Sequence, residues 1–164
     1  MTLEQLNQLP EIEFITNLAA IFEHSPWVAA NVVSERPFSS LEQLHTAMVG
    51  AVKTAPLKTQ LTLIRAHPDL GMRLKMSEQS VSEQVGLGLD RLSPTEFERF
   101  SSLNTAYREK FGFPFIVAVR NHSKTSILEQ FLIRLENAVE LEIETALEQI
   151  ATIAKFRLQD LIAA

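Results

Sequence analysis

The sequence predicts a single all-α domain, covering residues 1–164, that bundles about seven or eight helices. Apolar residues recur every three or four positions along most of the chain, whereas alternating strand patterns are nearly absent. Serine, proline and glycine stand where helices typically begin and end. With 164 residues, 46% of them hydrophobic, the chain is long enough to bury one core. We expect one exception to the helical pattern, a short buried irregular segment around Phe113–Phe115.

The N-terminal half is expected to contain helices over Glu11–Ile21, Trp27–Val33 and Leu57–Ala66, with another helix opened by Ser40. Gln43 stands three residues after Ser40, which is the spacing of a capping box. The core-facing positions are Ile12, Ile15, Leu18 and Ala19 in the first helix and Leu41, Leu44 and Met48 in the helix after Ser40.

In the C-terminal half, Ser93-Pro94-Thr95-Glu96 combines an N-cap serine, a proline at the first helical position and a capping-box glutamate. The helix that follows should run to about Lys110 and stop at Gly112. From Ser126 onward we expect nearly continuous helix with a break near Asn137. Its stripe, in which an arginine occupies a position that the pattern assigns to an apolar residue, consists of Ile143, Leu147, Ile150, Ala154, Arg157 and Leu161.

The segment between these helices is apolar almost throughout, from Phe111 to Val119, and is interrupted by Gly112 and Pro114. Few other strand candidates exist with which it could pair, so we expect a buried extended or irregular segment that can turn helical after Pro114. Buried backbone N–H and C=O groups need partners. A bound ligand can be one of them.

Composition and motifs exclude several classes of function. A net charge of −5 argues against a nucleic-acid surface, and the absence of cysteine removes disulfides, thiolate zinc sites and cysteine nucleophiles. We expect neither a metal nor a cofactor, because no G-x-S-x-G, H-E-x-x-H or Walker motif occurs. Leader patterns and apolar runs of roughly 18 residues are missing, so we expect a soluble cytoplasmic protein with a small-molecule partner and no membrane or nucleic-acid partner. The histidines expected to be structural or exposed are His24, His45 and His122.

His67 is the first candidate for chemistry. It stands where the helix over Leu57–Ala66 should end, because the ring of Pro68 disfavours helical geometry in the residue before it. The free carbonyls and the negative dipole at that end favour an imidazolium, which is a proton donor near neutral pH. The structural alternative is that His67 only satisfies the last carbonyls of the helix. Asp69 is expected to organise the turn rather than to act on a substrate.

Glu83 and Arg157 are the other candidates, and each has a structural alternative. Glu83 can be an acidic catalytic group, or it can bond back to the Ser80 amide, since the two residues have capping-box spacing. A helix start at Ser80 would also favour an anionic ligand. Arg157 can aim its guanidinium into a pocket, where it would need a carboxylate or a planar ligand. Alternatively, its stem packs along the core while the charged head reaches water.

Together these residues resemble the OHCU decarboxylase family, which acts on 2-oxo-4-hydroxy-4-carboxy-5-ureidoimidazoline in the last step from urate to (S)-allantoin. The likeness covers nearly the whole chain in order. Many family members read Leu-Ala-Gly after the aspartate, whereas here Leu70 is followed directly by Gly71. The matching elements are His67-Pro68-Asp69-Leu70, Ser80-x-x-Glu83-Gln84, Gly88-Leu89-Asp90, Asn104-x-x-Tyr107, Lys110-Phe111-Gly112-Phe113-Pro114-Phe115 and Ile153-Ala154-x-x-Arg157-Leu158.

The resemblance implies an all-α carboxy-lyase without a cofactor, in which His67 and Glu83 are catalytic. The electron pair left behind by CO2 can be held by the ring carbonyl as an enolate, so no other electron sink is needed. We expect Glu83 to lie near the substrate hydroxyl or carboxylate and protonated His67 to deliver a proton to one face. The resemblance further implies that the substrate-binding residues are Pro68, Ser80, Val81, Ser82, Gln84, Phe115, Ile116, Val117, Ala118, Val119 and Arg157.

Two other functions stay open at this point. The chain can be a non-catalytic helical interaction module whose polar loop is structural. It can also be a metal-dependent hydrolase using His67, Asp69 and Glu83, although a cluster with one imidazole is a poor soft-metal site. The apolar helical surfaces also allow a homodimer.

Overall fold

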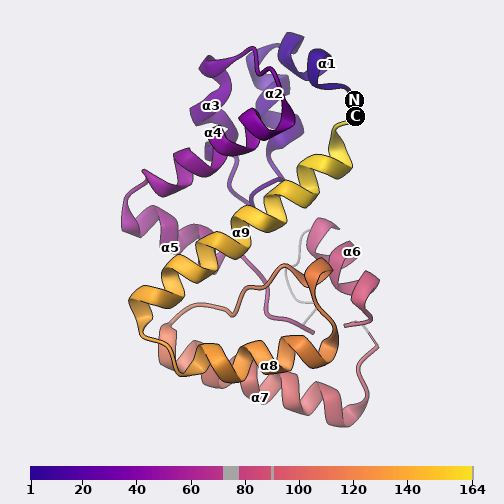
Figure 1. The fold of residues 1–164 in the computed structure, drawn as a ribbon, viewed down its shortest axis with the longest axis vertical. Helices are drawn as coiled ribbons and strands as arrows, with labels where there is room; N and C mark the ends of the chain where they lie inside the picture. Colours follow the sequence, from indigo (N-terminus) through magenta and orange to yellow (C-terminus); the bar gives the residue numbers. More distant parts are fainter. Residues whose placement is uncertain (72–77, 90, 164) are drawn as a thin grey trace. The chain divides into compact units, whose positions relative to one another are not determined.

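The computed structural model describes residues 1–71, 78–89 and 91–163, and for 78–82 it describes the backbone only. The described residues form nine α-helices, two short 3₁₀ helices and no β-strand, which confirms the all-α prediction (Figure 1). None of the helices in these ranges has the length and apolarity needed to cross a membrane. The α-helices are α1 (Leu3–Gln8), α2 (Glu11–Leu18), α3 (Trp27–Val32), α4 (Leu41–Lys53), α5 (Leu57–Arg65), α6 (Glu78–Leu87), α7 (Pro94–Phe111), α8 (Lys124–Leu135) and α9 (Val139–Leu161), and the 3₁₀ helices are η1 (Val33–Glu35) and η2 (Val119–Asn121).

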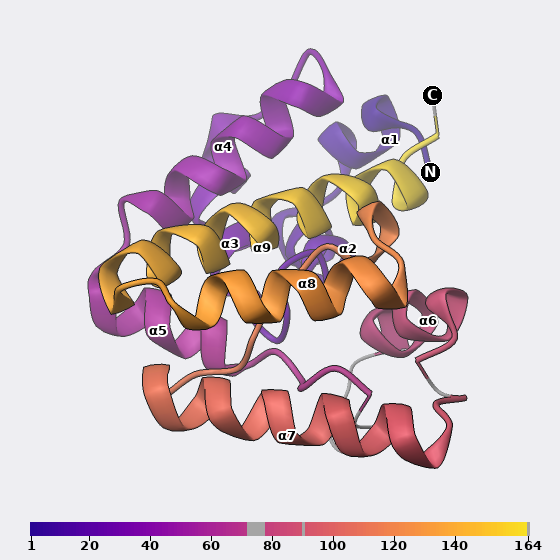
Figure 2. The same cartoon turned by 60° about the horizontal axis from the view of Figure 1, so that its bottom comes forward.

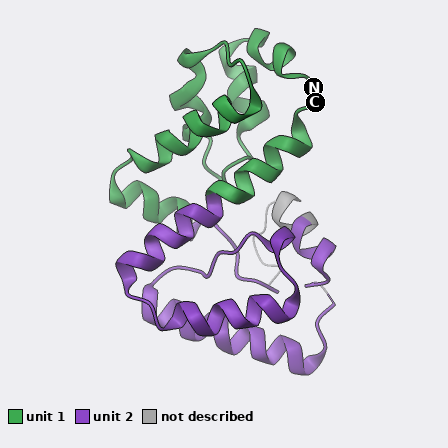
Figure 3. Cartoon of the chain, in the orientation of Figure 1, with its two compact units in different colours: residues 1–63, 151–164 green, residues 64–150 purple. Residues whose placement is uncertain are grey.

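The chain divides into two compact units, which Figure 3 shows in different colours. Unit 1 comprises Met1–Leu63 and Ala151–Ala164, and unit 2 comprises Ile64–Ile150. The two boundaries fall within α5 and α9. Each unit buries apolar side chains of its own. The single domain over residues 1–164 stays a prediction.

Unit 1 contains α1, a helix that the sequence analysis did not assign. Thr2 and Gln5 form a reciprocal capping box at its start: Gln5 N–H donates to Thr2 Oγ1 (3.1 Å) and Thr2 N–H donates to Gln5 Oε1 (2.9 Å). The two ends of the chain lie together in this unit, as the N and C labels of Figure 1 show. Ala163 N–H donates to the carbonyl of Met1 at 2.7 Å.

The buried face of α2 differs from the predicted stripe. Ile12 is 78% exposed, whereas Phe14 is fully buried. The reason is a tertiary contact, because the ring of Phe14 stacks with that of Phe38 at a centroid distance of 6.4 Å. Burying this aromatic ring removes more apolar surface from water than burying Ile12 would, so α2 turns Phe14 inward.

Ser40 caps α4 as predicted, but the capping box is only half formed. Gln43 N–H donates to Ser40 Oγ (3.0 Å), while Gln43 Oε1 accepts from the backbone of Ser39 instead of Ser40 (2.6 Å). The predicted core positions Leu44 and Met48 are fully buried. The N-cap and the core positions Leu44 and Met48 are therefore confirmed, whereas Leu41 is only half-buried, so its prediction is wrong.

The start and end of α7 follow the sequence signals closely. Ser93 and Glu96 form a reciprocal capping box, with Pro94 at the first helical position. Gly112 ends the helix with a φ of +77°, a left-handed conformation that glycine adopts without a Cβ penalty. The predicted break near Asn137 is confirmed by the gap between α8 and α9.

Unit 2 is organised around α7 and α8, which pack together (Figure 2). Their interface contains an aromatic cluster in which Phe115 stacks on Phe131 with ring centroids 3.8 Å apart. Tyr107 meets the ring of Phe115 edge to face at 5.3 Å. All of these rings are at most 1% exposed, so they form the centre of the unit's core.

The apolar segment after α7 is irregular and buried, as predicted. Every residue from 113 to 119 is buried, and no regular structure is present before η2 begins at Val119. The chain turns helical after Pro114 only at the 3₁₀ helix η2, and residues 115–118 stay non-helical. In this irregular segment Phe113 and Phe115 both contact the ring of Tyr107.

The buried face of α9 is offset from the predicted stripe. Ile143, Leu147 and Leu161 are only half-buried, so these three predictions are wrong, whereas those for Ile150, Ala154 and Arg157 are confirmed. A prediction from regular apolar spacing assigns only apolar residues to the buried face, and here a buried glutamate occupies the first turn of the helix. The buried positions are Glu142, Ala146, Ile150, Ile153, Ala154, Arg157 and Leu158.

Candidate active site

His67 lies at the end of α5, where the sequence places it. α5 ends at Arg65, and the backbone N–H of His67 donates to the carbonyl of Ile64 at 3.2 Å. The residue is 6% exposed, so its imidazole is largely removed from bulk water. Pro68 follows directly and stands outside any helix.

The loop after His67 is held against α7 by side chains of that helix. Arg108 Nε donates to both carboxylate oxygens of Asp69, at 2.8 and 3.0 Å. Asn104 Nδ2, in the buried interior, donates to the carbonyl of Leu70 at 2.8 Å. Asp69 is thus a residue that organises the turn, in agreement with the sequence-based interpretation.

The same loop is bonded to α6 through Gly71. Its N–H donates to Gln84 Oε1 at 3.0 Å, and Gln84 is buried. Gly71 has a φ of +77°, and an added Cβ would lie 2.8 Å from Leu92 Cδ1. The direct Leu70-Gly71 step of this chain therefore uses glycine to bring the loop onto Gln84. Gln84 was predicted to bind substrate, and its side-chain oxygen accepts this hydrogen bond from the loop.

Glu83 lies within α6 and not at a helix start capped by Ser80. The backbone is already helical from Glu78, so Ser80 is inside the helix and the capping-box alternative is wrong. Glu83 is half-buried, next to the buried Gln84. The side chains of the predicted substrate-binding residues Ser80, Val81 and Ser82 lie outside the described part of the structure.

Glu83 lines a pocket of unit 2 with a volume of about 270 Å³. The pocket also contains Val119, the last residue of the predicted backbone site, and two residues that the sequence analysis did not select, Arg120 and His122. His122 Nδ1 lies 2.9 Å from Ser126 Oγ, and burial, with a smaller effect of the nearby arginine in α8, lowers the pKa of His122. No sequence motif marks His122, because its place beside Glu83 depends on packing between η2 and α6.

In the backbone segment Phe115–Val119, predicted to bind substrate, some polar groups are hydrogen-bonded to side chains and others are not. The carbonyl of Ile116 accepts from Arg134 Nη1 at 2.5 Å, and the N–H of Ala118 donates to Gln149 Oε1 at 2.9 Å. Within the described residues, no hydrogen bond is formed by the backbone N–H groups of Ile116 and Val117. A buried donor without a protein partner is costly, so these groups are suited to a ligand.

Arg157 belongs to unit 1, and its guanidinium is buried with the rest of the side chain, at 4% exposure. Nη2 donates to Glu23 Oε2 at 2.9 Å and Nη1 donates to the carbonyl of Ala20 at 3.0 Å. The alternative in which the charged head reaches water is therefore wrong. The carboxylate that a buried guanidinium needs is Glu23, which the sequence analysis missed because it lies 134 positions away in the chain.

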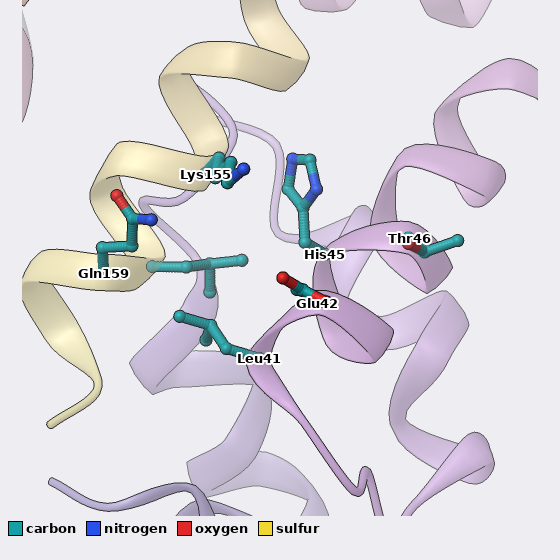
Figure 4. Close-up of a pocket in the computed structure, with 7 residues that line it drawn as sticks. Leu41, Glu42, His45, Thr46, Lys155 and Gln159 are labelled. Atoms are coloured by element: carbon teal, nitrogen blue, oxygen red, sulfur yellow. The ribbon is translucent and has the colours of Figure 1, made fainter. Parts of the chain in front are cut away.

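Unit 1 contains a second pocket, of about 470 Å³, between α4 and α9. Figure 4 shows Glu42 and His45 projecting from α4, and Lys155 and Gln159 from α9. His45 Nε2 is 2.7 Å from the carbonyl of Ala151, which fixes the orientation of the ring. None of the predicted site residues lines this pocket. No cluster of three or more potential metal ligands was found among the described residues of either unit.

The arrangement in unit 2 can support proton transfer and stabilise an anion. It holds a buried imidazole at the start of a loop, a carboxylate at a pocket and backbone N–H groups in an apolar segment. The loop of His67 and the helix of Glu83 are joined by the bond between Gly71 and Gln84. These are the groups needed for acid–base chemistry on a small polar molecule.

Comparison with known proteins assigns this chain to a family. A sequence model of the OHCU decarboxylase family matches residues 7–159, which include parts of both units. A 2-oxo-4-hydroxy-4-carboxy-5-ureidoimidazoline decarboxylase of Halalkalicoccus jeotgali is 44% identical over 161 residues, covering 98% of this chain and 92% of that protein. A uric acid degradation bifunctional protein of Bacillus subtilis is 47% identical over 98% of this chain, which spans 33% of the longer relative.

Solved structures agree with this assignment. A crystal structure of (S)-allantoin synthase has a TM-score of 0.81 and 36% sequence identity, and the match covers 99% of this chain and 54% of the other. An OHCU decarboxylase crystallised in the presence of (S)-allantoin shares the fold, with a TM-score of 0.74 at 23% identity over 90% of this chain and 99% of the other. The sequence match, the near full-length relative and the shared fold together show that this chain belongs to the OHCU decarboxylase family.

Proposed function

We propose that His67 and Glu83 are the catalytic residues with which this carboxy-lyase converts 2-oxo-4-hydroxy-4-carboxy-5-ureidoimidazoline to (S)-allantoin in urate degradation. Family membership supports the reaction. The observation that carries the residue assignment is the hydrogen bond from Gly71 to Gln84, because it ties the loop that follows His67 to the helix turn that carries Glu83. Both candidates therefore belong to one hydrogen-bonded part of unit 2.

The chemistry requires a place for electrons and a source of one proton. The bond between C4 and its carboxylate breaks, CO2 leaves, and the electron pair forms a C4=C5 double bond. The ring carbonyl at C2 is not bonded to C4, so the electron sink is the C5=N double bond of the imidazoline, whose nitrogen takes a proton. The intermediate is the enol of allantoin, with its oxygen on C4. Glu83, as a carboxylate near the departing group, disfavours the charged substrate more than neutral CO2. Protonated His67 then transfers its proton to the neighbouring carbon C5, which bears the ureido group, from one face and regains a proton from water. This sets the S configuration at C5, while the C4 hydroxyl loses its proton and becomes the carbonyl of allantoin.

Substrate binding is assigned to the residues around these two groups. The free N–H groups in the backbone segment Phe115–Val119 are suited to the substrate oxygen on C4, which gains negative charge as the enol forms. Ala118 would contribute contact surface instead of its N–H, which Gln149 already occupies. The roles of Arg157, and of Pro68 and the residues Ser80–Ser82 and Gln84, rest on the family resemblance.

The substrate class, the cellular location and the oligomeric state of the enzyme have different support. A small-molecule substrate follows from the family. A cytoplasmic location and a homodimer stay predictions from the sequence, and size-exclusion chromatography with light scattering would test the second. The bifunctional relatives place a similar sequence within a longer urate-degrading protein.

Circular dichroism of the allantoin formed tests the reaction directly. Freshly generated substrate decays spontaneously to racemic allantoin, which gives no signal, whereas the enzyme should give the signal of the S enantiomer. We expect a signal that grows in proportion to the enzyme concentration. Racemic product at every enzyme concentration would contradict the proposed function and favour the non-catalytic interaction module.

A further inference from the structure

We propose that Arg134 is a positioning residue that orients the peptide between Ile116 and Val117, so that the N–H of Val117 faces the substrate. This inference rests on the proposed function, because it deepens the role of the backbone segment in the same site. Arg134 is on α8 and is 3% exposed. Its Nη1 donates to the carbonyl of Ile116, and its guanidinium carbon lies 4.3 Å from the ring centroid of Phe115.

A set of buried side chains fixes the guanidinium in this position. Glu142, which is fully buried, accepts from Arg134 Nε at 2.7 Å and from the hydroxyl of Tyr107 at 2.6 Å. The other carboxylate oxygen accepts from Asn137 Nδ2 at 2.9 Å. Arg134 is therefore both neutralised and held at two sides, which leaves it little rotational freedom.

The contact between Arg134 and the carbonyl of Ile116 also determines the direction of the Val117 N–H. Among the described residues the cis peptide bond is Arg36-Pro37, so the peptide between Ile116 and Val117 is trans. In a planar trans peptide the carbonyl of Ile116 and the N–H of Val117 point in opposite directions. With the carbonyl turned toward Arg134, the Val117 N–H points away from it. The next peptide is anchored too, because Ala118 N–H donates to Gln149. Val117 is thus held between two fixed peptides.

The positive charge of Arg134 also strengthens the Val117 N–H as a hydrogen-bond donor. A cation on the carbonyl oxygen polarises the peptide, and a polarised peptide has a stronger N–H donor. A stronger donor favours the enolate-like oxygen on C4 over the neutral hydroxyl of the substrate, so the benefit is larger in the transition state than in the bound substrate. Arg134 would therefore act mainly on kcat, without touching the substrate.

A purely structural role makes a different prediction. A buried ion pair is often replaceable by uncharged residues with little loss of stability. If Arg134 and Glu142 only hold the core together, such a replacement should leave the kinetic constants unchanged in protein that is folded. If Arg134 orients the peptide, kcat should fall even where stability is retained.

The test uses the full chain with Arg134→Met combined with Glu142→Gln, which removes both charges together and leaves no unpaired buried ion. We expect kcat to fall about tenfold or more with KM changed less than about twofold, while the melting temperature stays close to that of the wild type. Arg99→Gln, an exposed arginine of α7, is the matched control and should leave kcat unchanged. Unchanged kcat in the folded double variant would overturn the proposal.

A measurement on the unmodified protein decides the matter if the double variant folds poorly. Addition of (S)-allantoin should shift the amide proton of Val117 downfield in a ¹⁵N-resolved spectrum, with a smaller change at Ala118 because its N–H is already bonded. An unperturbed Val117 amide in protein saturated with allantoin would also overturn the proposal. A wild-type protein that forms only racemic allantoin would instead contradict the proposed function itself.

Discussion

The backbone N–H of Gly71 donates to the side-chain oxygen of Gln84 across 3.0 Å. This bond joins the loop after His67 to α6 at the residue next to Glu83. Its geometry depends on a left-handed glycine in the loop and a buried amide in the helix. This contact therefore links the two proposed catalytic residues, while Arg108 and Asn104 hold the same loop against α7.

Removing either catalytic side chain should lower turnover strongly. We expect His67→Ala and Glu83→Ala each to reduce kcat by about 10²-fold or more, because each removes a group that acts on a proton or a charge in the transition state. The measurement is the initial rate of the circular dichroism signal of (S)-allantoin. Far-ultraviolet spectra should show unchanged helix content, and near-normal turnover by a folded His67 variant would contradict its assignment.

Gly71→Ala should destabilise the folded protein and lower its kcat. An alanine with φ near +77° is strained, and its Cβ would meet Leu92 Cδ1 at 2.8 Å, so we expect a loss of about 1–3 kcal/mol in the free energy of unfolding. Urea denaturation measures the loss, and kcat should fall with it because the loop shifts on α6.

Gly50→Ala is the matched control for this substitution. Gly50 lies within α4 with nothing within 4 Å of an added Cβ, so alanine there should stabilise the helix by about 0.5–1 kcal/mol. Equal effects of the two glycine substitutions would contradict the role of the left-handed turn at Gly71.

The buried pair of Glu23 and Arg157 should be stable only when it is complete. Glu23→Met leaves a buried guanidinium without its carboxylate, and we expect a loss of about 3–5 kcal/mol in unfolding free energy. Adding Arg157→Met should recover most of this loss. If Arg157 also binds substrate, the recovered protein should keep a raised KM, and a wild-type KM in that double variant would contradict the binding role.

Acidification should destabilise the folded state through His122. Burial, together with the nearby Arg134, lowers the pKa of His122 below its usual value of 6.5, so the unfolded chain binds a proton more readily than the folded one. The stabilising contribution is complete above pH 6.5 and is lost as the pH falls from there through the lower folded pKa. Thermal unfolding between pH 5 and 8 should show a weaker pH dependence for His122→Gln than for the wild type, and identical dependence would contradict this origin.

Local sequence was sufficient for the positions of most helix ends. Ser93 and Glu96 satisfy each other's backbone groups within one turn, and Gly112 adopts the left-handed conformation that ends α7. The end of α5 before His67 followed from the proline after it. Such features need no information from distant parts of the chain, because the interacting groups are three or four residues apart.

The partners of the buried charges could not be predicted in the same way. Arg157 was recognisable as a misplaced arginine, but nothing near it in the chain points to Glu23. Arg134 and Glu142 looked like ordinary polar residues of α8 and α9 until the structure showed both fully enclosed. Periodicity reports which face of a helix is apolar on average, and a buried ion pair breaks that average.

The sequence by itself determined that the chain is helical, where most helices begin and end, and which family motifs it carries. Tertiary structure decided which groups meet: Gly71 with Gln84, Arg134 with the carbonyl of Ile116, and Arg157 with Glu23. The physical reason is that capping and left-handed turns are satisfied within a few residues, whereas a desolvated charge must find its counterpart wherever folding brings one.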